Sequence, residues 1–368
     1  MSSSSYSLGA RWIHPVASPS LDNHFVNVRD GLIESLTPSP SQREVFDLGE
    51  ECRILPGVVN AHTHLELSQL PWPLTVPQIN GRRPFTAWID KLMAFRRSDA
   101  YDVGAGFRKA ASLPQLRIET AVLGDIAPLF PTFDLKSPER MAFFELLAWT
   151  EDAATATLDE ARRLLGGNSG LSPHAPQTVH PVIWRETVHW NVPLAVHLAE
   201  TPEEIELLRF RRGSLLELMR RADPNYDPES VLLGDRPLAY LKVLAESKRT
   251  LIVHGNYLDG EEIAFLGEQS DRMAVVYCPR THAYFGHDPY PLRQMLEAGV
   301  CVALGTDSLA SNPDLSLLNE MKFVYRNHPD IPLETVFRMG TLNGAIALGV
   351  ADRFGTLEPG KVAVFSFW

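Results

Sequence analysis

The sequence predicts an α/β protein, a (β/α)8 TIM barrel with a small β-sandwich domain formed from both chain ends. Three observations lead to this prediction. Eight short apolar runs alternate with helix-like segments, polar residues gather where these runs end, and the two chain ends share a turn-rich β pattern. Strands that alternate with helices in this rhythm are typical of parallel barrels. The 368 residues suffice for such a barrel, which holds about 250 residues as one unit.

The apolar runs are the candidate barrel strands. Each is short and rich in β-branched or leucine side chains, as strands buried on both faces are. They cover residues 53 to 60, 119 to 127, 141 to 148, 170 to 175, 193 to 200, 250 to 256, 273 to 279 and 300 to 307. Amphipathic segments lie between them, and one of these, PLRQMLEAG, closes with Gly299, a common residue just past a helix end.

The two chain ends differ from the middle of the chain. The first 52 residues contain short strands and turns, as in HFVNVRDGLIESLTPSP, and GTLEPGKVAVFSFW at the end is similar. We therefore expect residues 1 to 52 and 353 to 368 to form the small β-domain and residues 53 to 352 to form the barrel.

Composition excludes several classes of protein. The formal net charge of -11 gives no basic surface for nucleic acid or for an anionic membrane. Three widely spaced cysteines indicate neither a disulfide framework nor a cysteine zinc site, and they fit a reducing compartment. The sequence shows no signal-peptide pattern and no apolar run long enough to span a membrane. We expect a cytoplasmic protein without nucleic-acid or membrane partners, and a homodimer is compatible with the sequence.

Two histidines stand one residue apart at the end of the first apolar run, in VVNAHTHLELS. Alternate side chains of a strand point to the same side, so His62 and His64 converge on one point. Such a pair alone is as often two unrelated loop histidines, and further ligands are needed to indicate a metal site.

The ends of other candidate strands supply further polar groups. They are His174, His197, Glu200, His254 and Asp307. A barrel brings the carboxyl ends of its strands into one mouth, so these side chains should meet although they are far apart in sequence. Each alone has an ordinary interpretation, because a single histidine in an apolar run is more often a core residue and Asp307 can cap a helix. Their joint placement favours a metal centre.

Ligand chemistry then divides the roles. His62, His64, His197 and Asp307 fit one divalent metal ion, with Zn²⁺ as the default and Fe²⁺ or Mn²⁺ suited to the same set. Catalytic zinc keeps a position for a water whose pKa it lowers. Glu200 would move that water's proton to a leaving nitrogen, and Asp307 also belongs to the catalytic set. His254 would orient the hydroxide, and His174 would face the substrate. The alternative for Glu200 is a solvated carboxylate at a helix start.

Candidate substrate contacts lie around this mouth. Trp88, in RRPFTAWIDKLMAFRR, follows the first strand where a lid is usual, and it can stack on a base or pack into the core. Glu66 and Glu145 can read ring nitrogens, since a carboxylate in an apolar strand needs a partner; an Arg or Lys is the alternative partner. Arg280 and His282, after the seventh strand, can set specificity or lie in a surface loop.

Seven motifs occur in order between residues 56 and 361: PGVVNAHTHLELS, LSPHAPQTV, VHLAET, VHGNYL, CPRTHAYFG, GTDSLASN and TLNGAIALGVADRFGTLEPGK. Together they resemble the amidohydrolase superfamily, in the branch of cytosine, guanine and S-adenosylhomocysteine or methylthioadenosine deaminases and chlorohydrolases. The resemblance implies the same metal ligands, proton shuttling by Glu200, help from His254 and substrate contact by His174. The fourth strand has no lysine to bridge two metals, which implies a mononuclear site. Thr281 and His282 depart from the family's usual Ser-Asn.

The resemblance implies a hydrolase acting on carbon–nitrogen bonds other than peptide bonds. A metal-bound hydroxide would attack the amino-bearing ring carbon of a small purine-like heterocycle or nucleoside and release ammonia. The lid also resembles that of aminodeoxyfutalosine deaminases. Two alternatives stay open: a chlorohydrolase or cyclic amide hydrolase using the same site, and a non-catalytic scaffold barrel. The unrelated cytidine-deaminase fold is excluded because the chain has no P-C-x-x-C motif.

Overall fold

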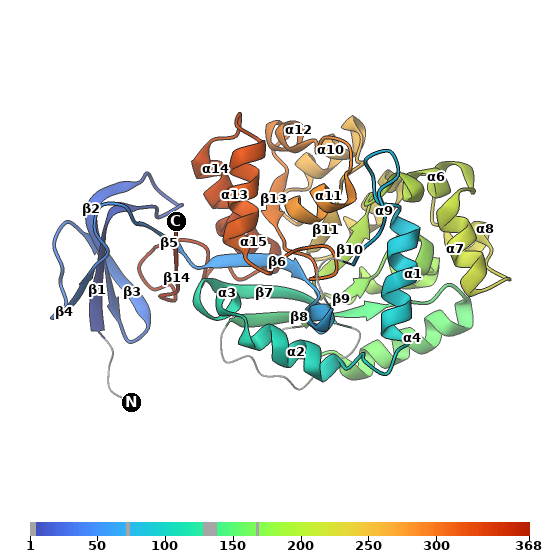
Figure 1. Ribbon diagram of the computed structural model, residues 1–368, viewed down its shortest axis with the longest axis horizontal. Coiled ribbons are helices and arrows are strands. Elements are labelled where there is room, and N and C mark those ends of the chain that lie inside the picture. Colours follow the sequence, from blue (N-terminus) through green and yellow to red (C-terminus); the bar gives the residue numbers. More distant parts are fainter. Residues whose placement is uncertain (1–4, 71–73, 128–137, 167–168) are drawn as a thin grey trace.

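A computed structural model describes residues 5–70, 74–127, 138–166 and 169–368. The chain forms a barrel and a smaller sheet, which lies at the left of Figure 1 together with both chain ends. The predicted fold class is confirmed.

The barrel sheet has eight parallel strands in the order in which the chain makes them. They are β6 (Val58–Thr63), β7 (Thr120–Ala127), β8 (Glu139–Leu146), β9 (Ser169–Pro173), β10 (Leu194–Leu198), β11 (Thr250–His254), β12 (Met273–Tyr277) and β13 (Cys301–Leu304). The sheet closes where the first and last strands meet. Thr63 bridges Asp307, and the backbone N–H groups of Thr306 and Asp307 both donate to the carbonyl of His62.

All eight predicted strands are present, but the first predicted run begins before the barrel strand does. The run from 53 to 60 is two strands, because β5 (Arg53–Pro56) belongs to the small sheet and β6 begins at Val58. Gly57 lies between them. A Cβ there would meet the Val364 side chain at 2.6 Å and Ala121 at 2.9 Å, so only glycine lets the chain pass between the two sheets.

Helices surround the barrel (Figure 1). After β6 come the 3-10 helix η1 (Leu65–Gln69), α1 (Phe85–Arg96), α2 (Val103–Ser112) and α3 (Pro114–Ile118). The middle of the chain adds α4 (Glu151–Leu164), η2 (Pro176–Thr178), α5 (Pro181–Thr187), α6 (Pro202–Phe210), α7 (Ser214–Ala222), α8 (Pro228–Val231) and α9 (Pro237–Leu244). The last part adds α10 (Gly260–Glu268), α11 (Pro279–Phe285), α12 (Leu292–Glu297), α13 (Leu317–Asn327), α14 (Leu333–Gly340) and α15 (Leu342–Leu348).

The helix signals in the sequence act as expected. Thr201 caps helix α6: its side chain accepts from the backbone N–H of Glu204, and Pro202 is the first helical residue. Helix α12 is followed by Gly299 at φ +79°, in the left-handed region that suits glycine. The lid segment is helical as α1, and its buried face carries Phe85, Trp88 and Leu92.

The small sheet combines β1 (Ser5–Ile13), β2 (Leu21–Arg29), β3 (Leu32–Thr37), β4 (Glu44–Asp47), β5 and β14 (Phe365–Phe367). The two chain ends meet where β14 pairs antiparallel with β5. Its own core contains Ile13, Val26, Val28 and Ile54, all fully buried. Because β5 belongs to it, the small sheet extends past residue 52.

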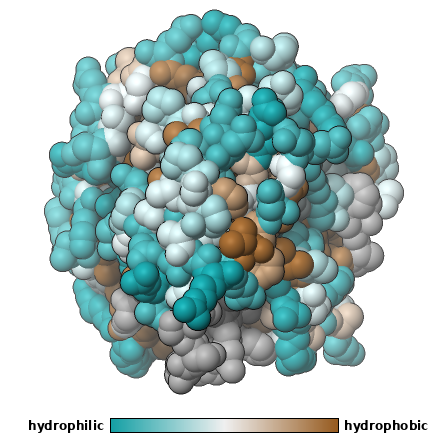
Figure 2. Space-filling view, turned by 90° about the vertical axis from the view of Figure 1, so that its left-hand side faces the viewer, coloured by the Kyte–Doolittle hydropathy of each residue, from teal (hydrophilic) through white to brown (hydrophobic). Residues whose placement is uncertain are grey.

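Surface features add little to the functional question. Figure 2 faces the small-sheet end of the molecule, which is largely hydrophilic with a small apolar patch near its centre. Within the described ranges, no helix is both long enough and apolar enough to cross a membrane.

Candidate metal centre and active site

His62 and His64 lie at the carboxyl end of β6, as the i, i+2 spacing predicts. Both are buried, and their ring centroids are 4.9 Å apart. The last strand brings Asp307 against them, with its Oδ1 3.7 Å from Nε2 of each histidine. Residues from the two ends of the barrel sequence thus share one side of the mouth.

His197 and His254, from β10 and β11, complete the cluster. Two overlapping groups have potential ligand atoms within 4.8 Å of one another: His62 with His197 and His254, and His62 with His64 and Asp307. The barrel therefore gathers four imidazoles and one carboxylate at the carboxyl ends of its strands, in two groups that share His62.

The cluster fits a divalent cation, and buried ring nitrogens without hydrogen-bond partners support this interpretation. Both ring nitrogens of His62 and Nδ1 of His64 are buried and make no hydrogen bond in the structure. Unpaired buried polar atoms are costly, so such a group calls for a ligand. Nδ1 of His197 lies 3.1 Å from the His174 carbonyl, which as acceptor fixes the proton on Nδ1 and leaves Nε2 free for a metal.

The pKa shifts of the histidines and of Asp307 agree with a metal-binding role for these side chains. Burial lowers the pKa of His64 and His197 well below the usual value, and it lowers that of His254 to about 3. Burial alone would raise the pKa of Asp307, but the nearby histidines hold it below its ordinary range. Neutral imidazoles and an ionised carboxylate are the forms that bind metals.

Glu200 lies next to the cluster, where its Oε1 is 3.4 Å from Nε2 of His254. Burial raises the pKa of Glu200 well above that of an ordinary carboxyl, and the Asp307 charge adds to the effect. Glu204 holds the local backbone, because its carboxylate accepts from the N–H groups of Ala199 at 2.7 Å and Glu200 at 3.0 Å. The Asn256 side chain also donates to the Glu200 carbonyl at 2.8 Å.

Three residues at or beside the site adopt left-handed backbone conformations that side chains other than glycine rarely take. They are Ala199 at φ +53°, His254 at φ +70° and Asp307 at φ +56°. Such conformations cost about 1–3 kcal/mol each and persist where the surroundings over-determine them. The sharp turns they make aim Glu200, His254 and Asp307 into the mouth.

A second polar group borders the metal cluster. Glu66, fully buried in η1, accepts a hydrogen bond of 2.9 Å from Arg96 at the end of α1. Its Oε1 is 4.0 Å from Nδ1 of His64, and its other oxygen has no partner. Glu145 Oε1 lies 3.9 Å from Nε2 of His174, whose Nδ1 pairs with the Thr178 hydroxyl at 2.7 Å.

Three other predicted contacts lie in different settings. Trp88 packs between Phe85 and Phe285, and its Nε1 donates to the Ala310 carbonyl at 3.1 Å, which favours the core-packing interpretation. The Arg280 guanidinium donates hydrogen bonds to the carboxylates of Asp314 and Glu320, which favours a structural role. His282 keeps a buried Nε2 without a partner and stays a candidate for substrate contact.

Sequence reasoning missed Arg96 and Glu204. Glu204 carried a signal, because a carboxylate in the first turn of a helix often binds free backbone N–H groups near the helix start. Arg96 carried none that separated it from its neighbour Arg97, since only the docking of α1 decides which of them enters the mouth.

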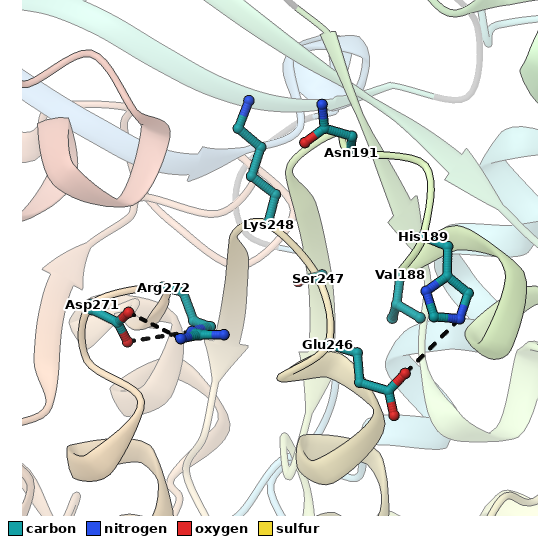
Figure 3. Close-up of a pocket in the computed structure, with 8 residues that line it drawn as sticks. All are labelled: Val188, His189, Asn191, Glu246, Ser247, Lys248, Asp271 and Arg272. Carbon is teal, nitrogen blue, oxygen red and sulfur yellow. Dashed lines mark hydrogen bonds and ion pairs between the residues drawn. The ribbon is translucent and has the colours of Figure 1, made fainter.

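A separate polar hollow of about 540 Å³ lies elsewhere (Figure 3). Its lining includes Asn191, Lys248 and Arg272, which precede β10, β11 and β12. The hollow is therefore at the amino ends of the strands, opposite the histidine cluster. Active sites of parallel barrels lie at the carboxyl ends, so this hollow is not the catalytic site.

The fold and the cluster define a metal-dependent hydrolase built on a (β/α)8 barrel. A model of the Amidohydrolase family matches residues 132–368, and the chain belongs to this family. It is a hydrolase of that family, with a divalent metal ion as its cofactor.

Individual proteins show the same relationship. The chain is 28% identical to a 5-methylthioadenosine/S-adenosylhomocysteine deaminase of Moorella thermoacetica, over 95% of this chain and 82% of that protein. Among solved structures, Helicobacter pylori aminofutalosine deaminase in complex with methylthio-coformycin is similar, with a TM-score of 0.81, 22% identity and coverage of 99% and 92% of the two chains. An adenosine deaminase from Xanthomonas campestris with bound zinc has a TM-score of 0.70, 21% identity and coverage of 98% and 84%.

Proposed function

We propose that this protein is a hydrolytic deaminase of an adenine-type nucleoside, with zinc as the metal ion. One observation carries the proposal: Glu200, with a raised pKa, lies 3.4 Å from His254 beside a histidine–aspartate cluster that fits a cation. The relative in Moorella thermoacetica is named as a deaminase of adenosine derivatives, which supports this substrate class.

In this proposal His62, His64, His197 and Asp307 bind the metal. When bound, the cation supplies a water of lowered pKa for attack on the ring carbon that bears the amino group. Glu200 takes a proton from that water and passes it to the ring or to the departing nitrogen, which leaves as ammonia. A carboxyl whose pKa is raised by burial can hold this proton between the two transfers.

His254 has a distinct role in this scheme. Its left-handed backbone and the bond from the Tyr290 hydroxyl to its carbonyl, at 2.9 Å, hold the ring beside Glu200. With its pKa lowered to about 3, the imidazole is neutral and acts as a hydrogen-bonding group that orients the attacking oxygen.

The polar group of Glu66, Arg96, Glu145 and His174 forms the substrate-recognition wall in this proposal. The free oxygen of Glu66 is buried and can accept a hydrogen bond from a substrate N–H or O–H group. His174 is fixed by Thr178, so its Nε2 is presented towards Glu145 and the mouth. A heterocycle with several donors and acceptors suits such a wall. Aminodeoxyfutalosine is one specific candidate substrate.

The test is ammonia release from a panel of substrates by zinc-loaded protein. Adenosine, methylthioadenosine, S-adenosylhomocysteine and aminodeoxyfutalosine are compared with guanine, cytosine and a chlorotriazine. Release from an adenine-type member supports the proposal. Chloride release from the triazine alone would instead support the chlorohydrolase alternative, and inactivity of metal-loaded protein on every member would support a scaffold.

Assembly and location stay predictions. We place the reaction in the cytoplasm, without nucleic-acid or membrane partners, and a homodimer remains compatible with the sequence. Light scattering of purified protein measures the assembly state.

A further inference from the structure

The carboxylate of Asp307 is held asymmetrically. Its Oδ1 faces the Nε2 atoms of His62 and His64, each at 3.7 Å. Its Oδ2 instead accepts a hydrogen bond of 3.1 Å from the Ser311 hydroxyl, and both residues are buried. The two oxygens of one side chain thus have separate partners: the histidines lie next to Oδ1, and the hydroxyl binds Oδ2.

The hydroxyl of Thr281 lies next to the hydroxyl of Ser311 and supports its hydrogen bond to Asp307. The Ser311 Oγ lies 3.0 Å from Oγ1 of Thr281, which is also buried. An ionised carboxylate only accepts, so the single proton of Ser311 is directed to Asp307. The 3.0 Å contact between the two hydroxyls is then a hydrogen bond that Thr281 donates to Ser311 Oγ. The chain of donors therefore runs from Thr281 through Ser311 to Asp307.

One buried carboxylate fixes the spacing of these two hydroxyls. Glu320, on α13, accepts from the backbone N–H of Arg280 at 2.9 Å and from the Asn312 side chain at 2.6 Å. Arg280 directly precedes Thr281, and Asn312 directly follows Ser311. Asn312 also donates to the Thr306 carbonyl at 2.6 Å, next to Asp307. The loop after β13 is thereby tied to α11 at the positions beside both hydroxyls.

We propose that Ser311 is a positioning residue for the metal centre: supported by Thr281, it holds Oδ2 of Asp307 so that Oδ1 alone is presented to the cation. The inference rests on the proposed function only in that Asp307 is taken as a metal ligand, and it is independent of the substrate. Groups that orient metal ligands in this way commonly change metal affinity by about 10- to 100-fold when removed.

The experiment measures the zinc affinity of apoprotein by competition with a chromophoric chelator. Ser311→Ala should weaken binding by about 10- to 100-fold. Thr281→Val, which keeps the shape and loses the hydroxyl, should weaken it by a smaller factor, whereas Thr281→Ser should bind zinc as the wild type does. Ser308→Ala removes another buried hydroxyl of the same loop that makes no bond to Asp307, and its affinity should be unchanged.

Two further measurements separate the possible failures. Asp307→Asn should weaken zinc binding more than any hydroxyl variant; if it binds zinc normally, the metal role of Asp307 is wrong. If Asp307→Asn weakens binding but Ser311→Ala does not, the positioning role alone is wrong. Should Ser311→Ala fail to fold by circular dichroism, the Thr281 pair decides, and equal affinities of Thr281→Val and Thr281→Ser overturn the proposal. The visible spectrum of the Co²⁺-loaded Thr281→Val variant should also differ from that of the wild type.

Discussion

Arg96 and Glu66 form a 2.9 Å ion pair that joins the last turn of α1 to η1, and Oε1 of Glu66 lies 4.0 Å from Nδ1 of His64. The Glu66 side chain is fully buried, and that of Arg96 is 22% exposed. In the proposed function, the pair therefore connects α1 with the substrate-recognition wall.

Replacing Arg96 should weaken substrate binding more than it slows the chemical step. Arg96→Gln removes the charged hydrogen-bond partner of the buried Glu66 carboxyl, which costs on the order of 1–3 kcal/mol. We expect KM to rise about 10-fold or more, the equivalent of roughly 1.4 kcal/mol, with a smaller change in kcat. Steady-state kinetics measure both constants. Arg97→Gln is the matched control, because Arg97 is exposed and should tolerate the change.

Glu200→Gln should abolish most of the turnover while zinc stays bound. The amide cannot carry the proton, and loss of a positioned acid–base group lowers kcat by about 10²- to 10⁴-fold. Ammonia release and metal content are measured on the same sample. Glu203→Gln removes an equal charge from the first turn of α6 and should keep near-normal turnover. A Glu200→Gln enzyme with normal turnover would contradict the assigned proton transfer.

Removing the metal should inactivate and destabilise the protein together. A ligand present at 100 times its Kd stabilises the folded state by about 2.7 kcal/mol, so the chelated protein should melt at a lower temperature. Differential scanning calorimetry and activity before and after Zn²⁺ is restored test this. His62→Asn should show neither the zinc-dependent rise in melting temperature nor the recovery of activity.

Stability should fall as the pH rises towards neutrality, in part because of Glu204. Burial raises the pKa of Glu204 to about 7, against 4.5 for an ordinary glutamate. The folded state then binds the proton more tightly than the unfolded state between these values, so the free energy of unfolding decreases with pH across this window and levels off above it. Urea titrations from pH 5 to 8 measure the slope. Glu204→Gln should be less stable at pH 5 and show a shallower slope, and an unchanged slope would contradict this origin.

Sequence patterns predicted the barrel because burial of a strand on both faces demands an unbroken apolar run, and each of the eight runs overlaps a barrel strand. The boundary at Gly57 could not be placed, since two strands in different sheets follow each other with one residue between them. The meeting of the histidines with Asp307 was predictable because strand ends fix where His62 and Asp307 must lie; their role as metal ligands stays a prediction. The contacts of Trp88 and Arg280 could not be predicted, because they depend on how α1 and α13 dock against the loops.

The seam between β6 and β13 has a consequence for biosynthesis. His62 and His64 emerge from the ribosome early, whereas Asp307, their neighbour across the seam, is among the last parts of the barrel to be made. A nascent chain cannot assemble this donor set until translation has passed β13. With the proposed ligand set, loading of the ion would therefore be a late event, and a truncated product would leave its amino-terminal histidines without their carboxylate.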